Sequence, residues 1–150
     1  MNHNLLASDR FAVVGAINPA SHAAGDVSTG WVSMADFHSL LAVVHAGTLG
    51  ASATLDAKVE QAQDATGTGV KDVEGRAITQ LTQAGGDSDK QALINLRSAD
   101  LDFAEAYTHV RLTVTVGAAA SQAAAMLFAT DPRYGSASDN DALSVAEIVS

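Results

Sequence analysis

Apolar and polar residues alternate strictly in two stretches of the chain. In 54–62, Leu55, Ala57 and Val59 are separated by polar residues, and in 109–116 every second residue is Val or Leu. A period of two places the two sets on opposite faces of a β-strand, whereas a helix would mix them. The pattern therefore predicts two half-buried strands.

Weaker patterns predict further strands. The segment 11–18 places Phe11, Val13, Gly15 and Ile17 on one face, and 76–83 is rich in Thr and short apolar residues. We therefore expect a strand in each of these segments.

Three other segments are apolar without a clear alternation. The segments 37–49 and 91–98 are apolar on both faces, which is typical of strands covered on each side or of short buried helices; their length and flanking residues favour strands. The segment 121–130 fits either a strand or a helical turn beneath a sheet, and we favour a strand.

The connecting segments carry the Gly, Asp, Asn, Ser and Pro residues of turns, including a predicted hairpin loop over 67–75. About seven or eight short strands without a long amphipathic helix predict an all-β fold, an antiparallel, jelly-roll-like β-sandwich. We expect one sandwich domain over 1–130 and an extended C-terminal arm over 131–150. The apolar end of that arm either docks on a neighbour or its own sheet edge, or is a frayed terminus.

Composition narrows the functional classes. Of 150 residues, 47% are hydrophobic and 17% are charged, as in a folded globular chain. Seventeen acidic residues against eight basic ones give a net charge of -9, which disfavours nucleic-acid binding. There is no cysteine, so disulfides and thiolate chemistry are excluded. The N-terminus does not resemble a secretory signal and no run is long enough to span a bilayer, so we expect a soluble protein without membrane contact.

A search for chemical motifs finds no site. The five histidines, at positions 3, 22, 38, 45 and 109, lack the spacing of metal ligands. No nucleophile elbow, catalytic triad or phosphate-binding loop is present. The alternating carboxylates of the loops 85–90 and 138–144 are of the type that binds calcium, but neither loop continues into a complete calcium loop. We therefore predict no catalytic residue, no cofactor and no metal, and a protein that is not an enzyme.

Several blocks of the sequence resemble a family of small proteins encoded beside the major capsid protein in tailed bacteriophages and prophages. The resemblance covers nearly the whole chain. Its most diagnostic blocks are 47–87, 107–116 and Arg133-Tyr134-Gly135, with shorter matches in 11–20 and 92–102.

The resemblance implies a structural virion protein, and in particular a head decoration or cement protein that binds and stabilises the shell of major capsid protein. We therefore expect a homotrimer on the capsid surface of the virion, made in the host cytoplasm. Two alternatives stay open: a head–tail connector, neck or tail protein, and a carbohydrate-binding β-sandwich.

Aromatic side chains are good interface anchors because they combine apolar area with few rotatable bonds. Trp31, Phe37, Tyr107 and Tyr134 are candidates, although burial in the core is the alternative for Trp31 and Phe37. The predicted interface residues are Tyr134, Trp31, Arg133, Lys71 and Ile148.

Overall fold

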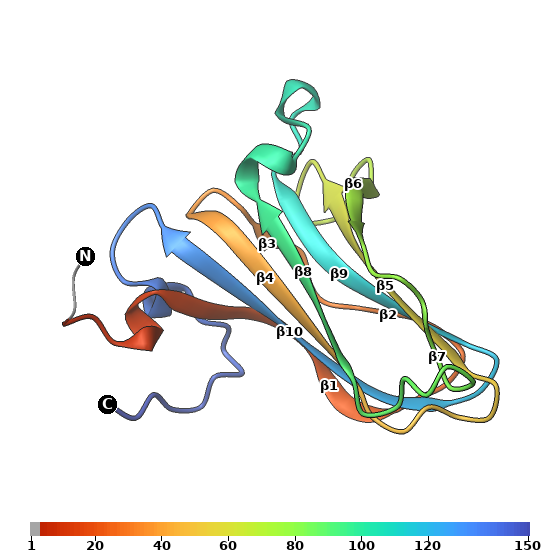
Figure 1. The fold of residues 1–150 in the computed structure, drawn as a ribbon. Helices are drawn as coiled ribbons and strands as arrows, with labels where there is room; N and C mark the ends of the chain where they lie inside the picture. The colour runs from red at the N-terminus through yellow and green to blue at the C-terminus, as the bar shows by residue number, and fades with distance from the viewer. Residues whose placement is uncertain (1–3) are drawn as a thin grey trace.

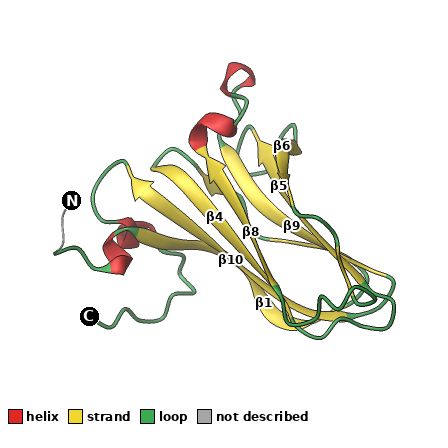
Figure 2. Ribbon diagram, in the orientation of Figure 1, coloured by secondary structure: helices red, strands yellow, loops and turns green. Residues whose placement is uncertain are grey.

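The alternating segments become strands of two antiparallel β-sheets that face each other (Figure 1). A computed structural model describes residues 4–150. The strands are β1 (Phe11–His22), β2 (Gly25–Ser28), β3 (Val32–Ser33), β4 (Phe37–Ala46), β5 (Thr54–Ala62), β6 (Lys71–Ala77), β7 (Leu81–Thr82), β8 (Gln91–Arg97), β9 (His109–Gly117) and β10 (Ser121–Pro132). The helical elements of residues 4–150 are all short 3-10 turns, η1 (Ala7–Asp9), η2 (Ser98–Asp100), η3 (Phe103–Glu105) and η4 (Ala137–Asn140) (Figure 2).

Strand order identifies the topology. One sheet has the order β1-β10-β4-β8 and the other β2-β9-β5-β6, with β3 beside β9 and β7 beside β5. Numbered 1 to 8 along the chain, the strands of at least four residues read 1-8-3-6 and 2-7-4-5. This interleaved order of antiparallel strands is that of a jelly roll. The predicted all-β, jelly-roll-like sandwich is therefore confirmed.

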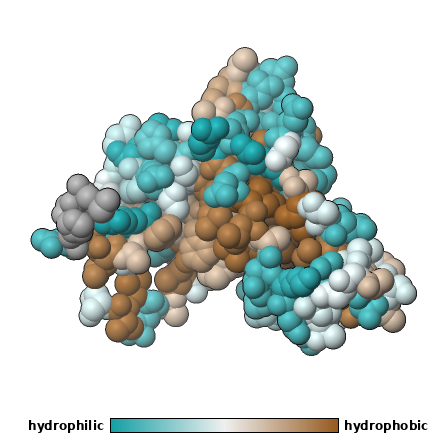
Figure 3. Space-filling model, viewed as in Figure 1, coloured by the Kyte–Doolittle hydropathy of each residue, from teal (hydrophilic) through white to brown (hydrophobic). Residues whose placement is uncertain are grey.

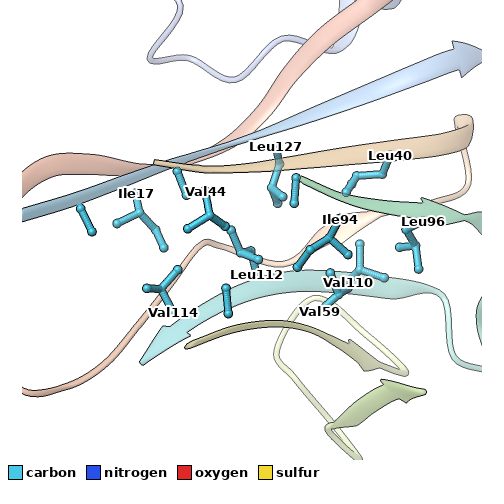
Figure 4. Packing of buried hydrophobic residues seen from close by; sticks show 14 of the residues in the cluster. Ile17, Leu40, Val44, Val59, Ile94, Leu96, Val110, Leu112, Val114 and Leu127 are labelled. Carbon is cyan, nitrogen blue, oxygen red and sulfur yellow. The ribbon is translucent and has the colours of Figure 1, made fainter. Parts of the chain in front are cut away.

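The core lies between the inner faces of the two sheets (Figure 4). From β5, Leu55 and Val59 point into it as the alternation predicts, and Leu112 of β9 and Leu127 of β10 meet them there. Burying one such side chain stabilises the fold by roughly 1.5–3 kcal/mol. Because both sheets contribute alternate residues, the core is continuous along the sandwich.

The strand at 11–18 is confirmed, but the residues predicted to share one face do not do so. The structure buries Ile17 on the same side as Ala12, whereas Phe11 is 44% exposed. The pairing of β1 with β10 shifts register between Val13 and Gly15. A bulge of this kind adds one residue to a strand, so the residues after it switch faces.

The predictions for three further segments are also wrong. β6 begins at Lys71, inside the predicted hairpin loop, and the predicted strand 76–83 is divided between the end of β6 and the two-residue β7. The segment 25–28 reads as a loop in the sequence, but it forms the short strand β2 because Gly25 to Ser28 pair with β9. In each case pairing with a partner strand outweighs weak local preference.

The segment 131–150 leaves the sandwich in stages. β10 continues to Pro132, and Ala137 of η4 is fully buried against Ala12, Phe37 and Ala129. The amide of Ala142 then donates to the carbonyl of Val13 at 2.7 Å. We use "arm" below for residues 143–150, which follow this contact. Within residues 4–150, no helix is long and apolar enough to cross a membrane.

Replacing Leu55 with Ala should lower the free energy of unfolding by about 2–5 kcal/mol, because the truncation leaves a cavity between the sheets. Urea unfolding followed by circular dichroism measures this loss. Leu5, which is exposed, is the matched control, and Leu5→Ala should change stability by no more than about 0.5 kcal/mol. Equal losses in the two variants would contradict the assigned core.

Candidate interaction surface

Two connections lie against each other at one end of the sandwich. The loop 63–70 joins β5 to β6, and the segment 98–108 joins β8 to β9 and rises above the sheets in Figure 1. Gln63 Nε2 donates to the carbonyl of Glu105 at 2.8 Å, and the Thr108 amide donates to the carbonyl of Ala62 at 3.0 Å. We call these two segments together the tip.

Asp64 organises the loop 63–70. Its carboxylate accepts hydrogen bonds from the amide and hydroxyl groups of both Thr66 and Thr68, at 2.6–3.1 Å. The bonds from Thr68 and then Thr66 lower the pKa of Asp64 well below its usual range. The loop is therefore held in one shape by its own side chains, although its Gly and Thr content reads as a flexible connector.

Trp31 packs beside this loop. Gly67 has a φ of +87°, and a Cβ there would lie 2.8 Å from the Trp31 ring nitrogen, so a larger residue does not fit. The guanidinium of Arg111 stacks on the Trp31 ring, 4.7 Å from its centroid. Trp31 is only partly buried and does not lie wholly in the core. Its contacts with Gly67 and with Arg111 of β9 fix the loop to that strand.

Arg111 is held in turn by Glu60. Arg111 Nε and the Thr113 hydroxyl both donate to Glu60 Oε2 at 2.7 Å. Burial opposes ionisation of Glu60, but these bonds outweigh it and lower the pKa of the carboxyl. The ion pair is thus a stable part of the outer surface below the tip.

Lys71 clamps the segment 98–108. Its ammonium lies 2.8 Å from Asp102 and 3.0 Å from Glu105, and 4.2 Å from the centre of the Tyr107 ring. The bond to Asp102, followed by that to Glu105, raises the pKa of Lys71 above its usual range. The Tyr107 hydroxyl donates to the carbonyl of Gly69 at 2.6 Å, which ties the two parts of the tip together.

The base of the segment is braced as well. Arg76 pairs with Asp100 at 2.8 Å, and Arg133 donates to the Ser98 hydroxyl at 3.1 Å. The segment braced in this way carries Phe103, which the sequence interpretation missed and which has 52% of its surface exposed. An exposed aromatic side chain on a braced support can anchor a partner protein.

The predicted interface residues therefore have different surroundings. Trp31 and Lys71 flank the loop 63–70, and Arg133 reaches the base of the segment 98–108. Tyr134 follows Arg133 and is 76% exposed. Ile148 lies on the arm, beside Phe11 and Phe128. The structure thus associates the first three with the tip and places Ile148 elsewhere.

A second surface lies on the outer face of the sheet β1-β10-β4-β8. Antiparallel partners point to the same side, so cross-strand pairing defines two adjacent rows there. The first row is Ala16–Met126–Val43–Leu93, and the second is Val13–Phe128–Leu41–Asn95. We call these two rows the apolar face. Figure 3 shows hydrophobic residues gathered at the centre of this side of the molecule.

The apolar face corrects an expectation about burial. The strands β4 and β8 are confirmed, but β8 is not covered on both sides as expected, because Leu93 is 61% exposed. Beside it, Met126 of β10 is 40% exposed. The reason is position, because β8 is an edge strand and, within residues 4–150, no third layer of strands covers this sheet.

The acidic loops have structural partners. Asp87 accepts from the Thr82 amide at 2.9 Å, and Asp141 accepts from the Val13 amide at 2.7 Å. Among residues 4–150, no group of three or more His, Asp or Glu residues is arranged to hold a metal ion. His3 lies outside the described residues.

Neither a protein family model nor a curated protein sequence matches the chain. Among solved structures, it is similar to a chain of the empty virus-like particle of cowpea mosaic virus, with a TM-score of 0.50 and 11% identity over 89% of this chain and 86% of that one. It also aligns with a chain of infectious bursal disease virus, Gt strain, with a TM-score of 0.44 and 12% identity over 91% of this chain and 37% of that one.

A third alignment, with the pilus protein of Bacillus endospore appendages, has a TM-score of 0.35 and 13% identity, and covers 87% of this chain and 99% of that one. The TM-scores of the second and third alignments are too low to support a conclusion about this chain. The first similarity, together with the strand order, establishes that this chain has a jelly-roll sandwich fold, which it shares with that chain of the virus-like particle.

Replacing Glu60 with Gln should lower the free energy of unfolding by about 1–3 kcal/mol at pH 7, because the ionised carboxylate accepts from Arg111 and Thr113. The folded pKa of Glu60 is lowered from its usual value of 4.5, so this stabilisation is complete above that pH and lost as the pH falls through the folded pKa.

Urea unfolding of the wild type and Glu60→Gln from pH 7 to pH 3 measures this difference. Glu74 on β6 is exposed, so Glu74→Gln is the matched control and should follow the wild type at every pH. A difference between the wild type and Glu60→Gln that stays constant down to pH 3 would contradict the assigned ion pair.

Proposed function

We propose that this chain is a structural virion protein, a decoration or cement protein that binds the assembled shell of a phage major capsid protein and stabilises the head. The observation that carries the proposal is the similarity to a chain of an empty virus-like particle, which covers 89% of this chain and 86% of that one. Fold alone does not fix function, so the resemblance to proteins encoded beside the major capsid protein supplies the particular role. This role requires no catalytic centre and no cofactor.

The tip supports the proposal as the surface that contacts the shell. Phe103 of the tip offers exposed aromatic area, as does Tyr134, which lies outside the tip; Lys71 and Arg133 bind the segment 98–108 that carries Phe103. A support that is already ordered loses little conformational entropy on binding. Each contact is small, but a lattice presents many copies of the site. In this proposal Lys71, Arg133 and Trp31 shape the tip and the aromatic residues touch the shell.

Purified particles provide the first test. Quantitative mass spectrometry of the particle should give a copy number comparable to that of the major capsid protein. The recombinant chain should also bind shells that lack it and raise their melting temperature. A copy number of about twelve would instead indicate a ring at the neck or tail. Closed shells formed by this chain alone, or no copies in the particle, would overturn the proposal.

Phe103→Asp should weaken binding to shells at least about tenfold, because it removes a central aromatic anchor and adds a charge. The exposed residue Ala84, in the loop at the other end of the sandwich, provides the control. Ala84→Asp adds the same charge and should bind as the wild type does. Pelleting of shells with increasing concentrations of each variant measures the affinity. Wild-type binding by Phe103→Asp would exclude the tip as the contact surface.

A further inference from the structure

The chain leaves its apolar face only partly covered. The arm runs past the β1 side of the sheet, where Val145 and Ile148 line a groove with Phe11, Leu41 and Phe128. No residue of β8 lines this groove, so Leu93 and its neighbours stay in contact with solvent. A contiguous apolar surface of this kind is uncommon on a monomer and marks an interaction site.

The arm also exposes large apolar side chains to solvent. Leu143 is fully exposed and Val149 is 84% exposed, although both are large aliphatic residues. The hydrogen bonds of Val13 to Ala142 and Asp141 fix the start of the arm at the sheet edge, but among the described residues no hydrogen bond is seen for positions 146–150. The same chain therefore contains an open apolar face and an apolar segment that its own fold buries only in part.

We propose that the apolar face binds a second copy of this chain, and that the arm of one copy lies across the face of the other. Leu143, Ile148 and Val149 are the arm residues that enter the contact, and Leu93, Met126 and Val43 receive them. The inference goes beyond the proposed function, because it concerns association of the chain with itself in the absence of a particle.

Charge favours this face for contact between copies. Two copies of a chain with a net charge of -9 repel each other, and the two rows of the apolar face contain no charged residue. The outer face of the other sheet instead carries Asp26 and Asp56, together with Glu60, which is paired with Lys58 and Arg111. Close approach there would remove water from these charged groups, whereas approach through the apolar face would not.

The size of the surface explains why the arm is needed. The two rows of the apolar face cover four strands at about 4.8 Å spacing and about four residues of 3.4 Å along each strand, which is an area of roughly 260 Å². A standard interface buries roughly 800 Å² on each partner, so the sheet face alone falls short. The eight arm residues span roughly 26 Å when extended, which exceeds the roughly 19 Å width of the four strands. An exchanged arm would therefore supply the missing area.

Analytical ultracentrifugation of the purified full chain tests the proposal without any virus particle. The wild type should sediment as a discrete oligomer rather than as the 15.3 kDa monomer. Leu93→Asp should raise the dissociation constant at least about tenfold, and so should removal of residues 143–150. Val70 is also an exposed aliphatic residue but lies in the loop 63–70, so Val70→Asp should sediment as the wild type does. A wild type that stays monomeric over a 100-fold range of protein concentration would overturn the proposal. An oligomer that Leu93→Asp does not weaken would also overturn it.

Cross-linking identifies the contact directly. The chain contains no cysteine, so a disulfide between two variants with one cysteine each must join two copies. Mixing Leu93→Cys with Val149→Cys or Leu143→Cys under mild oxidation should give a covalent dimer, whereas mixing Val70→Cys with the same arm variants should not. Cross-links confined to the Val70 pairs would overturn the arm contact.

Experiments can distinguish failure of this inference from failure of the proposed function. Loss of self-association in Leu93→Asp with unchanged binding to shells would support the face as a contact between copies. If the chain is always monomeric and Leu93→Asp abolishes binding to shells, the apolar face binds the shell and not a second copy. That result would overturn this inference and leave the proposed function standing.

Discussion

Contact between the inner faces of the two sheets holds this molecule together. Leu55 and Val59 of β5 meet Leu127 of β10 and the side chains around it, and every other residue of these strands is drawn into the same layer. Because side chains alternate along a strand, this contact also decides which residues remain outside. The properties of the two outer faces therefore follow from the core, and they differ sharply.

One outer face is polar and internally paired. Glu60 holds Arg111, which stacks on Trp31, and Lys71 joins β6 to the segment 98–108. The exposed pairs of Lys71 contribute little to global stability, whereas the pair of Glu60 with Arg111 is largely buried and contributes more. The local effect of the Lys71 pairs is larger, because they determine the shape of the tip that carries Phe103.

The other outer face is apolar and open. Its two rows lack charge, and the arm that begins beside β1 ends in aliphatic residues that remain in solvent. The tip and the apolar face lie on different parts of the molecule, so the use of one does not block the other. A protein that must bind a lattice and also associate with its own copies needs two such separate surfaces.

The sequence by itself determined the strands with the clearest alternation, 54–62 and 109–116, and the all-β class. It also drew attention to Trp31 and Lys71 through residue type. It did not identify the bulge in β1, the strand formed by 25–28, or Phe103, whose exposure depends on how the segment 98–108 is braced by Arg76 and Arg133. Alternation is local, because it arises from the geometry of a single strand. What covers each face depends on residues far away in the sequence, so only the tertiary structure decided that the apolar strands β4 and β8 would leave one side open.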